Sequence, residues 1–391
     1  MTDERVVVVG TSMTEFGERD AWINDLLAQA AVDCLADADV SPDELDHVHV
    51  SNMASGEFEG TTGIANALVS EIGAHGAYAH RVDGTSASGG AGVQSAYRSV
   101  ASGASDATLL VGGEKMTHLP TSRTTDIISS LTHPVEYKHG VTLPSFAGLA
   151  ARLYLEKHDA PRESLARVAV KNHRNALDNP MAQFRKEVTA EDVLDSPIVA
   201  DPLRLYDFCP ITDGSAALLL CPEDAARERF GFFDDEYTVV SGVGGSTDTH
   251  AVHEREDPTR ITAAVESSRE AYSQAGVTPD DVDVAELHDM FSILEFLQSE
   301  DLGFFDRGEG WRAAEEGRTE RDAEVPVNTS GGLKARGHPL GATGVAQLHE
   351  LHAQLLDDAG ERQVDEADVG VACNLAGFGN CVTTTVLEVA R

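Results

Sequence analysis

Apolar and polar positions along the chain fall into blocks that predict helices and short buried strands in alternation. The β-branched run from Val6 to Val9 predicts a first strand, and the apolar spacing from Leu26 to Leu35 predicts an amphipathic helix. The apolar run from Ala107 to Glu114, with two glycines near its end, predicts a buried strand. Because helices alternate with buried strands in both halves, the pattern predicts an α/β fold whose sheets are covered by helices.

The pattern occurs twice within the chain. Val40-Ser41-Pro42-Asp43 corresponds to Val277-Thr278-Pro279-Asp280 at an offset of 237 residues, and each segment predicts a turn in which Pro starts a short helical segment. A predicted helix precedes each copy, at Leu26 to Leu35 and at Ile261 to Ala275, and a predicted strand follows each. Two long copies indicate duplicated domains, because solenoid repeats are shorter and more numerous.

A second correspondence pairs two chemically distinct residues. Ser86-Ala87-Ser88-Gly89-Gly90-Ala91-Gly92-Val93 aligns with His338-Pro339-Leu340-Gly341-Ala342-Thr343-Gly344-Val345 at an offset of 252 residues, so Ser86 stands opposite His338. Both segments predict glycine-rich helix starts. A nucleophile and a base at equivalent positions of two repeats can meet across a pseudo-twofold axis.

The duplication divides the chain into three parts. We expect a first half at residues 1–117, a loop domain at 118–205 and a second half at 206–391. Residues 117–145 show little periodicity, whereas 146–158 and 162–177 predict helices. An insertion between the halves can act as a lid that covers a site.

Acidic residues greatly outnumber basic ones. The chain has 66 Asp and Glu against 29 Lys and Arg, only six of them lysines, and its formal net charge is −37. Two interpretations are open: an acidic surface without a special partner, or adaptation to a salt-rich cytoplasm, where salt screens self-repulsion. The spread of acids along the whole length favours the second interpretation, and the sign of the charge argues against nucleic-acid binding.

The remaining composition favours a cytoplasmic protein. No apolar run approaches the ~20 residues that a membrane-spanning helix needs, and residues 1–5 lead straight into the first predicted strand, leaving no signal peptide. The five cysteines show no zinc-site spacing and no C-x-x-C pair. We therefore expect reduced thiols, most of them in the core, and no metal site.

Two helix starts are candidates for a nucleophile and a base. At the start of a helix, Ser86 would lie beside free N–H groups that stabilise a developing oxyanion; a plain helix cap is the alternative. Pro339 predicts that His338 lies beside another helix start, whose dipole would keep the imidazole neutral, as a general base requires. The alternative for His338 is a histidine that only hydrogen-bonds a loop.

Two further candidates follow predicted strands. His288 comes just past a strand end, where sites gather in α/β sheets; an exposed histidine in a turn is the alternative. Cys373 opens a glycine-rich turn, either as a tuned acid–base thiol or as a buried core thiol.

Four segments together resemble the active-site loops of thiolases, in the same order along the chain. The resemblance extends over the whole chain, and the His-Asp-x-Phe form is similar to the sterol-carrier-type and archaeal branch. It implies a thiolase fold, in which two duplicated βαβαβαββ halves form a five-layered α-β-α-β-α core with an inserted loop domain. The segments are Ser86-Ala87-Ser88-Gly89, His288-Asp289-Met290-Phe291, Gly337-His338-Pro339 and Cys373-Asn374-Leu375.

The resemblance also implies an acyltransferase mechanism. A nucleophile takes the acyl group of one acyl-CoA, and a second acetyl-CoA loses an α-proton and attacks the acyl-enzyme, giving a 3-ketoacyl-CoA; thiolysis is the reverse. By position, Ser86 is the nucleophile, His338 activates it, and His288 completes with His338 the first oxyanion hole. The Ser86 N–H and one from the turn after Cys373 form the second hole, and Cys373 falls at the acid–base cysteine.

The implied substrates are coenzyme A thioesters, with no bound cofactor and no metal. Gly245, Ser246 and Gly377 fall near the substrate contacts of the family. Basic residues of the loop region are further candidates for contacting coenzyme A: Lys138, Arg152, Lys171 and Arg174.

The chain departs from the thiolase pattern at the nucleophile, where Ser86 replaces a cysteine. A hydroxyl is not ionised near neutrality and needs a stronger base than a thiol does. Three interpretations of Ser86 follow. It is a working nucleophile, or the chain has lost catalysis and only binds acyl-CoA, or the serine is an engineered substitution. The other site segments match the thiolase pattern, which favours an active enzyme. In composition the chain also resembles a group of salt-loving archaeal ketothiolases that use Ser with two histidines.

The main hypothesis is therefore a β-ketothiolase acting on short acyl groups, as a homodimer or a dimer of dimers. Archaeal relatives of this type assemble with a small partner that carries an OB-fold and sometimes a zinc ribbon. The alternative is a catalytically weak thiolase-like subunit that presents acyl-CoA to such a partner. Gly337-His338-Pro339 argues against a ketoacyl or hydroxymethylglutaryl synthase of the same fold.

Overall fold

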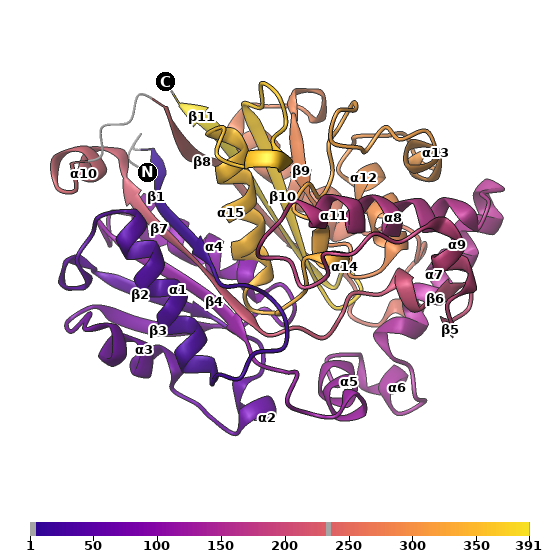
Figure 1. Cartoon of the computed structure of the whole chain (residues 1–391), viewed down its shortest axis with the longest axis horizontal. Helices are drawn as coiled ribbons and strands as arrows, with labels where there is room; N and C mark the ends of the chain where they lie inside the picture. The colour runs from indigo at the N-terminus through magenta and orange to yellow at the C-terminus, as the bar shows by residue number, and fades with distance from the viewer. Residues whose placement is uncertain (1–4, 232–235, 391) are drawn as a thin grey trace.

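One nine-stranded sheet runs through the molecule in the order β3-β2-β4-β7-β1-β8-β11-β10-β9 (Figure 1). The computed structural model describes residues 5–231 and 236–390; residues 1–4, on which the expectation about a signal peptide rests, lie outside them. Strands of the first half form one end of the sheet and strands of the second half the other. They join where β1 pairs with β8, through Val7 with Val239 and Val8 with Thr238.

The first half has five strands, and its last strand comes from beyond the inserted segment. Residues 214–222 pair with both the first and the fourth strand, so they complete the sheet of this half, although the sequence placed them in a second half at 206–391. The elements are β1 (Val6–Met13), α1 (Ile23–Asp37), η1 (Pro42–Glu44), β2 (His47–Ser51), α2 (Ser55–Glu59), α3 (Ile64–Ile72), β3 (Tyr78–Val82), α4 (Ser88–Ala101), β4 (Thr108–Glu114) and β7 (Gly214–Pro222).

The inserted segment is mainly helical. The helices expected at 146–158 and 162–177 are confirmed, whereas the stretch expected to lack regular structure contains two helices of only one to three turns. Such short helices bury few residues and leave no readable apolar period. The elements are α5 (Thr121–Ser129), α6 (Pro134–Tyr137), α7 (Leu143–His158), α8 (Glu163–Leu177), α9 (Ala190–Asp195), β5 (Ile198–Ala200), β6 (Leu203–Arg204) and η2 (Leu205–Asp207).

The second half repeats the first with one strand reduced. The counterpart of β3 is reduced to a single parallel bridge between Ala285 and Val327. The elements are α10 (Glu223–Glu228), β8 (Tyr237–Thr247), η3 (Val252–Glu254), α11 (Thr262–Ala275), η4 (Pro279–Asp281), β9 (Val284–Glu286), α12 (Ser292–Asp301), α13 (Gly310–Glu315), α14 (Gly332–Ala335), α15 (Thr343–Leu355), η5 (Gly360–Arg362), β10 (Val369–Ala376) and β11 (Cys381–Ala390).

The repeated turn has the same local cause in both halves. In η1 the carboxylate of Glu44 accepts the Ser41 N–H at 3.0 Å, and in η4 Asp281 accepts the Thr278 N–H at 2.8 Å. Pro follows Ser41 and Thr278 as the first residue of each short helix, where its missing N–H costs nothing. The turn predicted from the sequence repeat is therefore confirmed.

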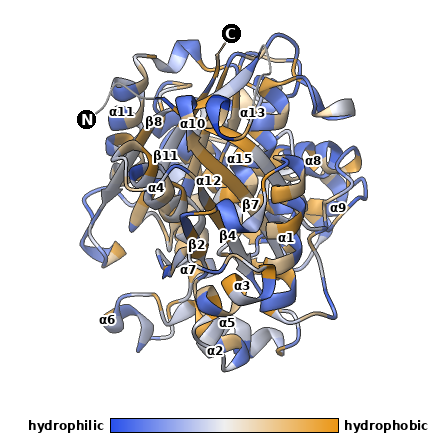
Figure 2. Ribbon diagram, turned by 90° about the vertical axis from the view of Figure 1, so that its left-hand side faces the viewer, coloured by the Kyte–Doolittle hydropathy of each residue, from blue (hydrophilic) through white to orange (hydrophobic). Residues whose placement is uncertain are grey.

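The sheet and helices form five layers. Helices α4 and α15 each contact strands of both halves, so they lie between the two parts of the sheet, while α1 and α11 cover the outer faces. Figure 2 shows hydrophobic residues concentrated on the central strands and hydrophilic residues on the peripheral helices and loops. The α-β-α-β-α architecture expected from the resemblance is confirmed. None of the described helices is long and apolar enough to cross a membrane.

Helices α4 and α15 pack against each other at glycine residues. A Cβ built on Gly89 would lie 2.5 Å from the backbone nitrogen of Gly344, and one built on Gly344 would overlap the backbone nitrogen of Gly90. Because only glycine permits this approach, the two glycine-rich segments of the repeat meet backbone to backbone. The crossing brings the Ser86 end of α4 and the His338 end of α15 to one place.

Candidate active site

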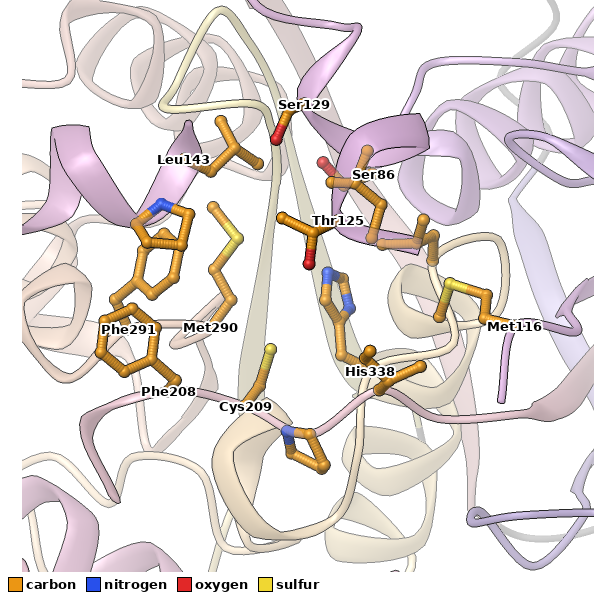
Figure 3. A pocket seen from close by; sticks show the side chains of 15 residues that line it. Ser86, Met116, Thr125, Ser129, Leu143, Phe208, Cys209, Met290, Phe291 and His338 are labelled. Atoms are coloured by element: carbon orange, nitrogen blue, oxygen red, sulfur yellow. The ribbon is translucent and has the colours of Figure 1, made fainter. Parts of the chain in front are cut away.

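A small cavity opens at this crossing, and Ser86 and His338 both line it (Figure 3). It encloses about 140 Å³, and most of its wall is apolar. Ser86, from the first half, and His338, from the second, therefore share one pocket, as the sequence repeat predicts. The loop domain supplies part of the wall. The apolar lining includes Met116, Ile128, Leu143, Phe208, Met290 and Leu340.

Ser86 occupies a strained turn and is not a helix cap. Helix α4 begins two residues later, and the Ser88 hydroxyl fastens the turn by accepting the Gly84 N–H at 3.0 Å and donating to the Thr85 carbonyl at 2.6 Å. Thr85 has φ +54°, a conformation that a β-branched residue rarely adopts. The Ser86 hydroxyl oxygen instead accepts the Gly377 N–H at 3.2 Å, so the capping alternative is wrong.

His338 presents an unprotonated ring nitrogen to the cavity. The Thr343 hydroxyl has one hydrogen, which it donates to the Pro339 carbonyl at 3.1 Å, so it accepts from His338 Nδ1 at 2.7 Å. The single proton of the neutral imidazole is then on Nδ1. His338 Nε2 is buried without a hydrogen-bond partner among the described residues. This is the tautomer that a general base requires.

The cause of the neutral state of His338 differs from the expected one. Burial, followed by the positive charge of Arg336, lowers the pKa of His338 to about 3. Pro339 begins a turn, and α15 itself starts only at Thr343, so the helix end is not the main cause. Removal from water is the larger of the two causes, because burial destabilises the charged imidazole.

His288 lies behind the cavity with its ring perpendicular to that of His338, and the ring centroids are 4.8 Å apart. It is fully buried, so the alternative of an exposed turn histidine is wrong. Burial, then the proximity of His338, lowers the pKa of His288 well below its usual range. The Leu375 N–H donates to His288 Nδ1 at 3.3 Å, and Nε2 has no partner among the described residues.

Cys373 does not reach the cavity. Its side chain packs in the core of the second half, where burial raises the pKa of its thiol to about 12, and it interacts with Thr384. The geometry favours the core-thiol alternative over the acid–base role. The cavity wall instead contains Cys209, although most of the five thiols were expected in the core. Burial likewise raises the pKa of Cys209 to about 12.

Of the three residues expected at substrate contacts, the structure brings one to the site. Gly377 N–H reaches Ser86, whereas Gly245 and Ser246 lie on β8 outside the cavity, and the Gly245 N–H donates to Glu270 at 3.0 Å. Most basic candidates of the loop region are engaged elsewhere. Lys171 is buried against Glu295 at 2.6 Å, and Arg152 and Arg174 form ion pairs with Asp201 and Glu320.

Glu114 ties the His338 turn to the first half. Its carboxylate accepts the N–H groups of Met53 at 2.9 Å, Ala54 at 3.0 Å and Gly341 at 3.1 Å. Gly341 lies three residues after His338, so this contact fixes the turn that carries the base. Within residues 5–231 and 236–390, no group of three or more His, Cys, Asp or Glu side chains is arranged to hold a metal ion.

Comparison with known proteins decides the family. The model of the thiolase N-terminal domain matches residues 6–224, and the model of the thiolase C-terminal domain-like family matches residues 244–389. The chain belongs to the thiolase family. The matches confirm the resemblance that the four sequence segments indicated, and they make this thiolase an acyltransferase.

Two relatives match nearly the whole of this chain. An acetyl-CoA acetyltransferase of Methanothermobacter thermautotrophicus is 44% identical over 384 residues, which covers 98% of this thiolase and 99% of the relative. Sterol carrier protein 2 of Homo sapiens is 31% identical over 409 residues, which covers 99% of this thiolase and 72% of the relative.

Solved structures share the fold at lower identity. An Ltp2-ChsH2(DUF35) aldolase has a TM-score of 0.84 at 22% identity and covers 99% of this thiolase and 98% of that chain. Human mitochondrial 3-ketoacyl-CoA thiolase in complex with CoA has a TM-score of 0.77 at 18% identity. The match covers 99% of this thiolase and 98% of that chain. At these identities the comparison concerns the fold alone.

Proposed function

We propose that this thiolase is an acyl-CoA:acetyl-CoA C-acyltransferase that condenses short acyl-CoAs with acetyl-CoA and catalyses the reverse thiolysis through an acyl-enzyme on Ser86. One observation carries the proposal. A buried serine hydroxyl and the free Nε2 of a neutral histidine line the same small apolar cavity. A hydroxyl needs such a base before it can act as a nucleophile.

The first stage transfers the acyl group to Ser86. The hydroxyl proton passes to His338 Nε2 while Oγ attacks the thioester carbon. The C–S bond breaks, and the departing thiolate takes the proton and leaves as coenzyme A. His288 Nε2–H, with the protonated His338, holds the thioester oxygen, and the Gly377 N–H beside Ser86 stabilises charge on the other side of the site.

The second stage needs no further base. His338 Nε2 removes the α-proton of acetyl-CoA, the carbanion attacks the ester carbon, and the C–O bond to Ser86 breaks. The alkoxide then recovers the proton from His338, so protons balance with one histidine. This single-base scheme agrees with the position of Cys373 in the core, away from the cavity.

The acyl-enzyme is the test of this proposal. Incubation with acetyl-CoA should increase the intact mass by one acetyl group, and peptide mapping should place that group on Ser86. The enzyme should also cleave acetoacetyl-CoA in the presence of CoA. An acetyl group on another residue, or none while cleavage proceeds, would refute the Ser86 mechanism. The measurement belongs in molar KCl, since we propose that the acidic chain works in a salt-rich cytoplasm.

The cavity volume of about 140 Å³ supports a preference for short acyl groups. Met290→Ala should extend the cavity, because this buried side chain forms part of its wall. We expect kcat/KM for hexanoyl-CoA relative to acetyl-CoA to rise about tenfold or more, since each added methylene is worth roughly 1–3 kcal/mol. Met13→Ala truncates a buried methionine outside the cavity and should leave the ratio unchanged. An unchanged ratio in Met290→Ala would contradict the assignment of this wall.

A partner subunit is a second candidate role, and one comparison favours it. The structurally similar Ltp2-ChsH2(DUF35) aldolase is named as an assembly of two proteins. We propose that this thiolase binds a small OB-fold or zinc-ribbon subunit, either as the active enzyme or as a subunit that presents acyl-CoA. Rates measured with and without the product of the neighbouring gene separate these cases: activity only in the mixture supports the presenting role.

We also propose a homodimer that forms at the edge of the sheet. β3 is the last strand on its side, and Tyr78 on it is 65% exposed. The unpaired backbone of an edge strand is a template for another strand. Sedimentation at micromolar concentration should give twice the chain mass, and a monomer would exclude this assembly.

A further inference from the structure

Asn374 connects the helix that follows Ser86 to His288, and its orientation is fixed. It lies on β10 and is almost fully buried. The Gly90 N–H donates to Oδ1 of Asn374 at 3.0 Å, and a backbone N–H can only donate. The other side-chain atom is therefore the amide nitrogen, which lies 2.9 Å from His288 Nδ1.

The amide nitrogen of Asn374 determines where His288 carries its proton. An amide N–H₂ is a donor only, so His288 Nδ1 must accept, and the Leu375 N–H at 3.3 Å is a second donor to the same nitrogen. A neutral imidazole has one proton, which is thus on Nε2. His338 has the opposite arrangement, because Thr343 accepts its Nδ1 proton. At Nε2, His288 is therefore a hydrogen-bond donor and His338 is an acceptor.

We infer that Asn374 is a positioning residue that holds His288 in the Nε2-protonated tautomer and so makes it a hydrogen-bond donor to the thioester oxygen. The inference rests on the proposed acyl transfer at Ser86. Without Asn374, His288 Nδ1 keeps only the longer contact with the Leu375 N–H at 3.3 Å, so the Nε2-protonated tautomer is held less firmly. With Asn374 in place, His288 cannot compete with His338 for the Ser86 proton, because its Nε2 already carries one.

The titratable groups near His288 are few. The ring of His338 is 4.8 Å away, and Asp289 follows in the chain. The Asp289 carboxylate accepts the Leu333 N–H at 2.7 Å and the Asn172 amide at 2.6 Å, so it faces away from the imidazole. Asn374 is therefore the group through which the proton position can be changed.

Asn374→Asp tests the inference with almost no change of shape. One carboxylate oxygen can still accept the Gly90 N–H, but the other can only accept. Its charge-assisted bond favours a proton on His288 Nδ1 over the longer contact with the Leu375 N–H at 3.3 Å. Neutral His288 then has a bare Nε2, and we expect kcat at pH 8 to fall by about 100-fold, as for loss of one oxyanion donor. At lower pH the doubly protonated ring regains its Nε2–H. The activity of the variant should therefore rise as pH falls toward 6, while that of the natural enzyme does not.

A matched variant separates tautomer from packing. Asn179 is equally buried, donates to the Ser330 carbonyl at 2.9 Å and accepts the Met181 N–H at 3.0 Å, and neither partner is a histidine. Asn179→Asp should lower thermal stability to a similar extent but leave the shape of the pH profile unchanged. If Asn374→Asp also keeps the natural profile, the inference is wrong.

A direct measurement holds even if Asn374→Asp does not fold. In the natural protein with ¹⁵N-labelled histidine, NMR should show the His288 signal, identified by its loss in His288→Gln, as Nε2-protonated. A proton on Nδ1 would overturn the inference. If the enzyme shows no acyl transfer, the proposed function fails, but this spectrum still decides the tautomer.

Discussion

Ser86→Ala is expected to lower kcat for acetoacetyl-CoA cleavage by about 10⁴- to 10⁶-fold, as loss of a nucleophile does in enzymes with a serine–histidine pair. Ser86 and His338 line the same cavity, and the Ser86 hydroxyl makes no cap to helix α4. Its removal therefore deletes the acyl acceptor and little else. Steady-state kinetics measure the loss, and calorimetric titration with CoA should give a Kd that changes by only a few-fold.

Two variants make the result specific to Ser86. Ser102→Ala removes a hydroxyl at the far end of the same helix, where it donates to the Ser99 carbonyl at 3.2 Å, and should keep nearly full activity. Ser86→Cys restores a nucleophile that is partly ionised near neutrality and should form a detectable acyl-enzyme. A Ser86→Ala protein that retains the natural rate would show that the acyl group is carried elsewhere.

His338→Gln is expected to lower kcat by about 10³- to 10⁵-fold, because glutamine can hydrogen-bond the Ser86 hydroxyl but cannot take its proton. Both chemical stages of the proposed scheme pass a proton through Nε2, so acylation and condensation should slow together. Rapid mixing with acetyl-CoA measures the first stage, and acetoacetyl-CoA formation measures both. Loss of condensation with normal acylation would mean that another base serves Ser86.

The control for this variant lies on α15, the helix that follows His338. His349 is also held neutral, since burial lowers its pKa to about 4, and its Nδ1 pairs with Thr11 at 2.9 Å. His349→Gln should reduce activity by no more than about twofold, as substitutions away from special features do.

The same base predicts an unusual pH profile. The pKa of His338 is lowered to about 3, so its base form persists as pH falls, and only protonation near pH 3 removes it. The kcat/KM of the natural enzyme should therefore stay constant from pH 8 to pH 5. An acid limb near pH 6.5 would identify the working base as a histidine that is not buried.

The sequence could predict that Ser86 and His338 share one cavity, because the two residues occupy equivalent positions of the sequence repeat. Glycine at Gly89 and Gly344 is required by the close approach of two helices, and that requirement leaves the same spacing in both copies. Polar residues at equivalent places of a duplicated fold must then face each other across the pseudo-twofold axis. The five-layered architecture follows from the same duplication.

The residues next to the pair could not be assigned from the sequence. On β10 the side chains alternate, so Asn374 faces Gly90 and His288 while its neighbour Cys373 faces the core, and a motif does not reveal the phase of a strand. Cys209 lies in extended chain between η2 and β7, where no periodicity marks one side as cavity. For this geometric reason Cys373 lies in the core, although the motif around it suggested an acid–base role.

The contact of α4 and α15 through glycine makes the spacing of the proposed nucleophile and base depend on the main chain. Side chains elsewhere in the core can change rotamer to absorb a small displacement, but at Gly89 and Gly344 backbone atoms touch directly. A methyl group added at either glycine would overlap backbone atoms of the other helix, so the two helices would have to separate. This backbone contact consequently limits how closely and at what spacing the two halves can pack.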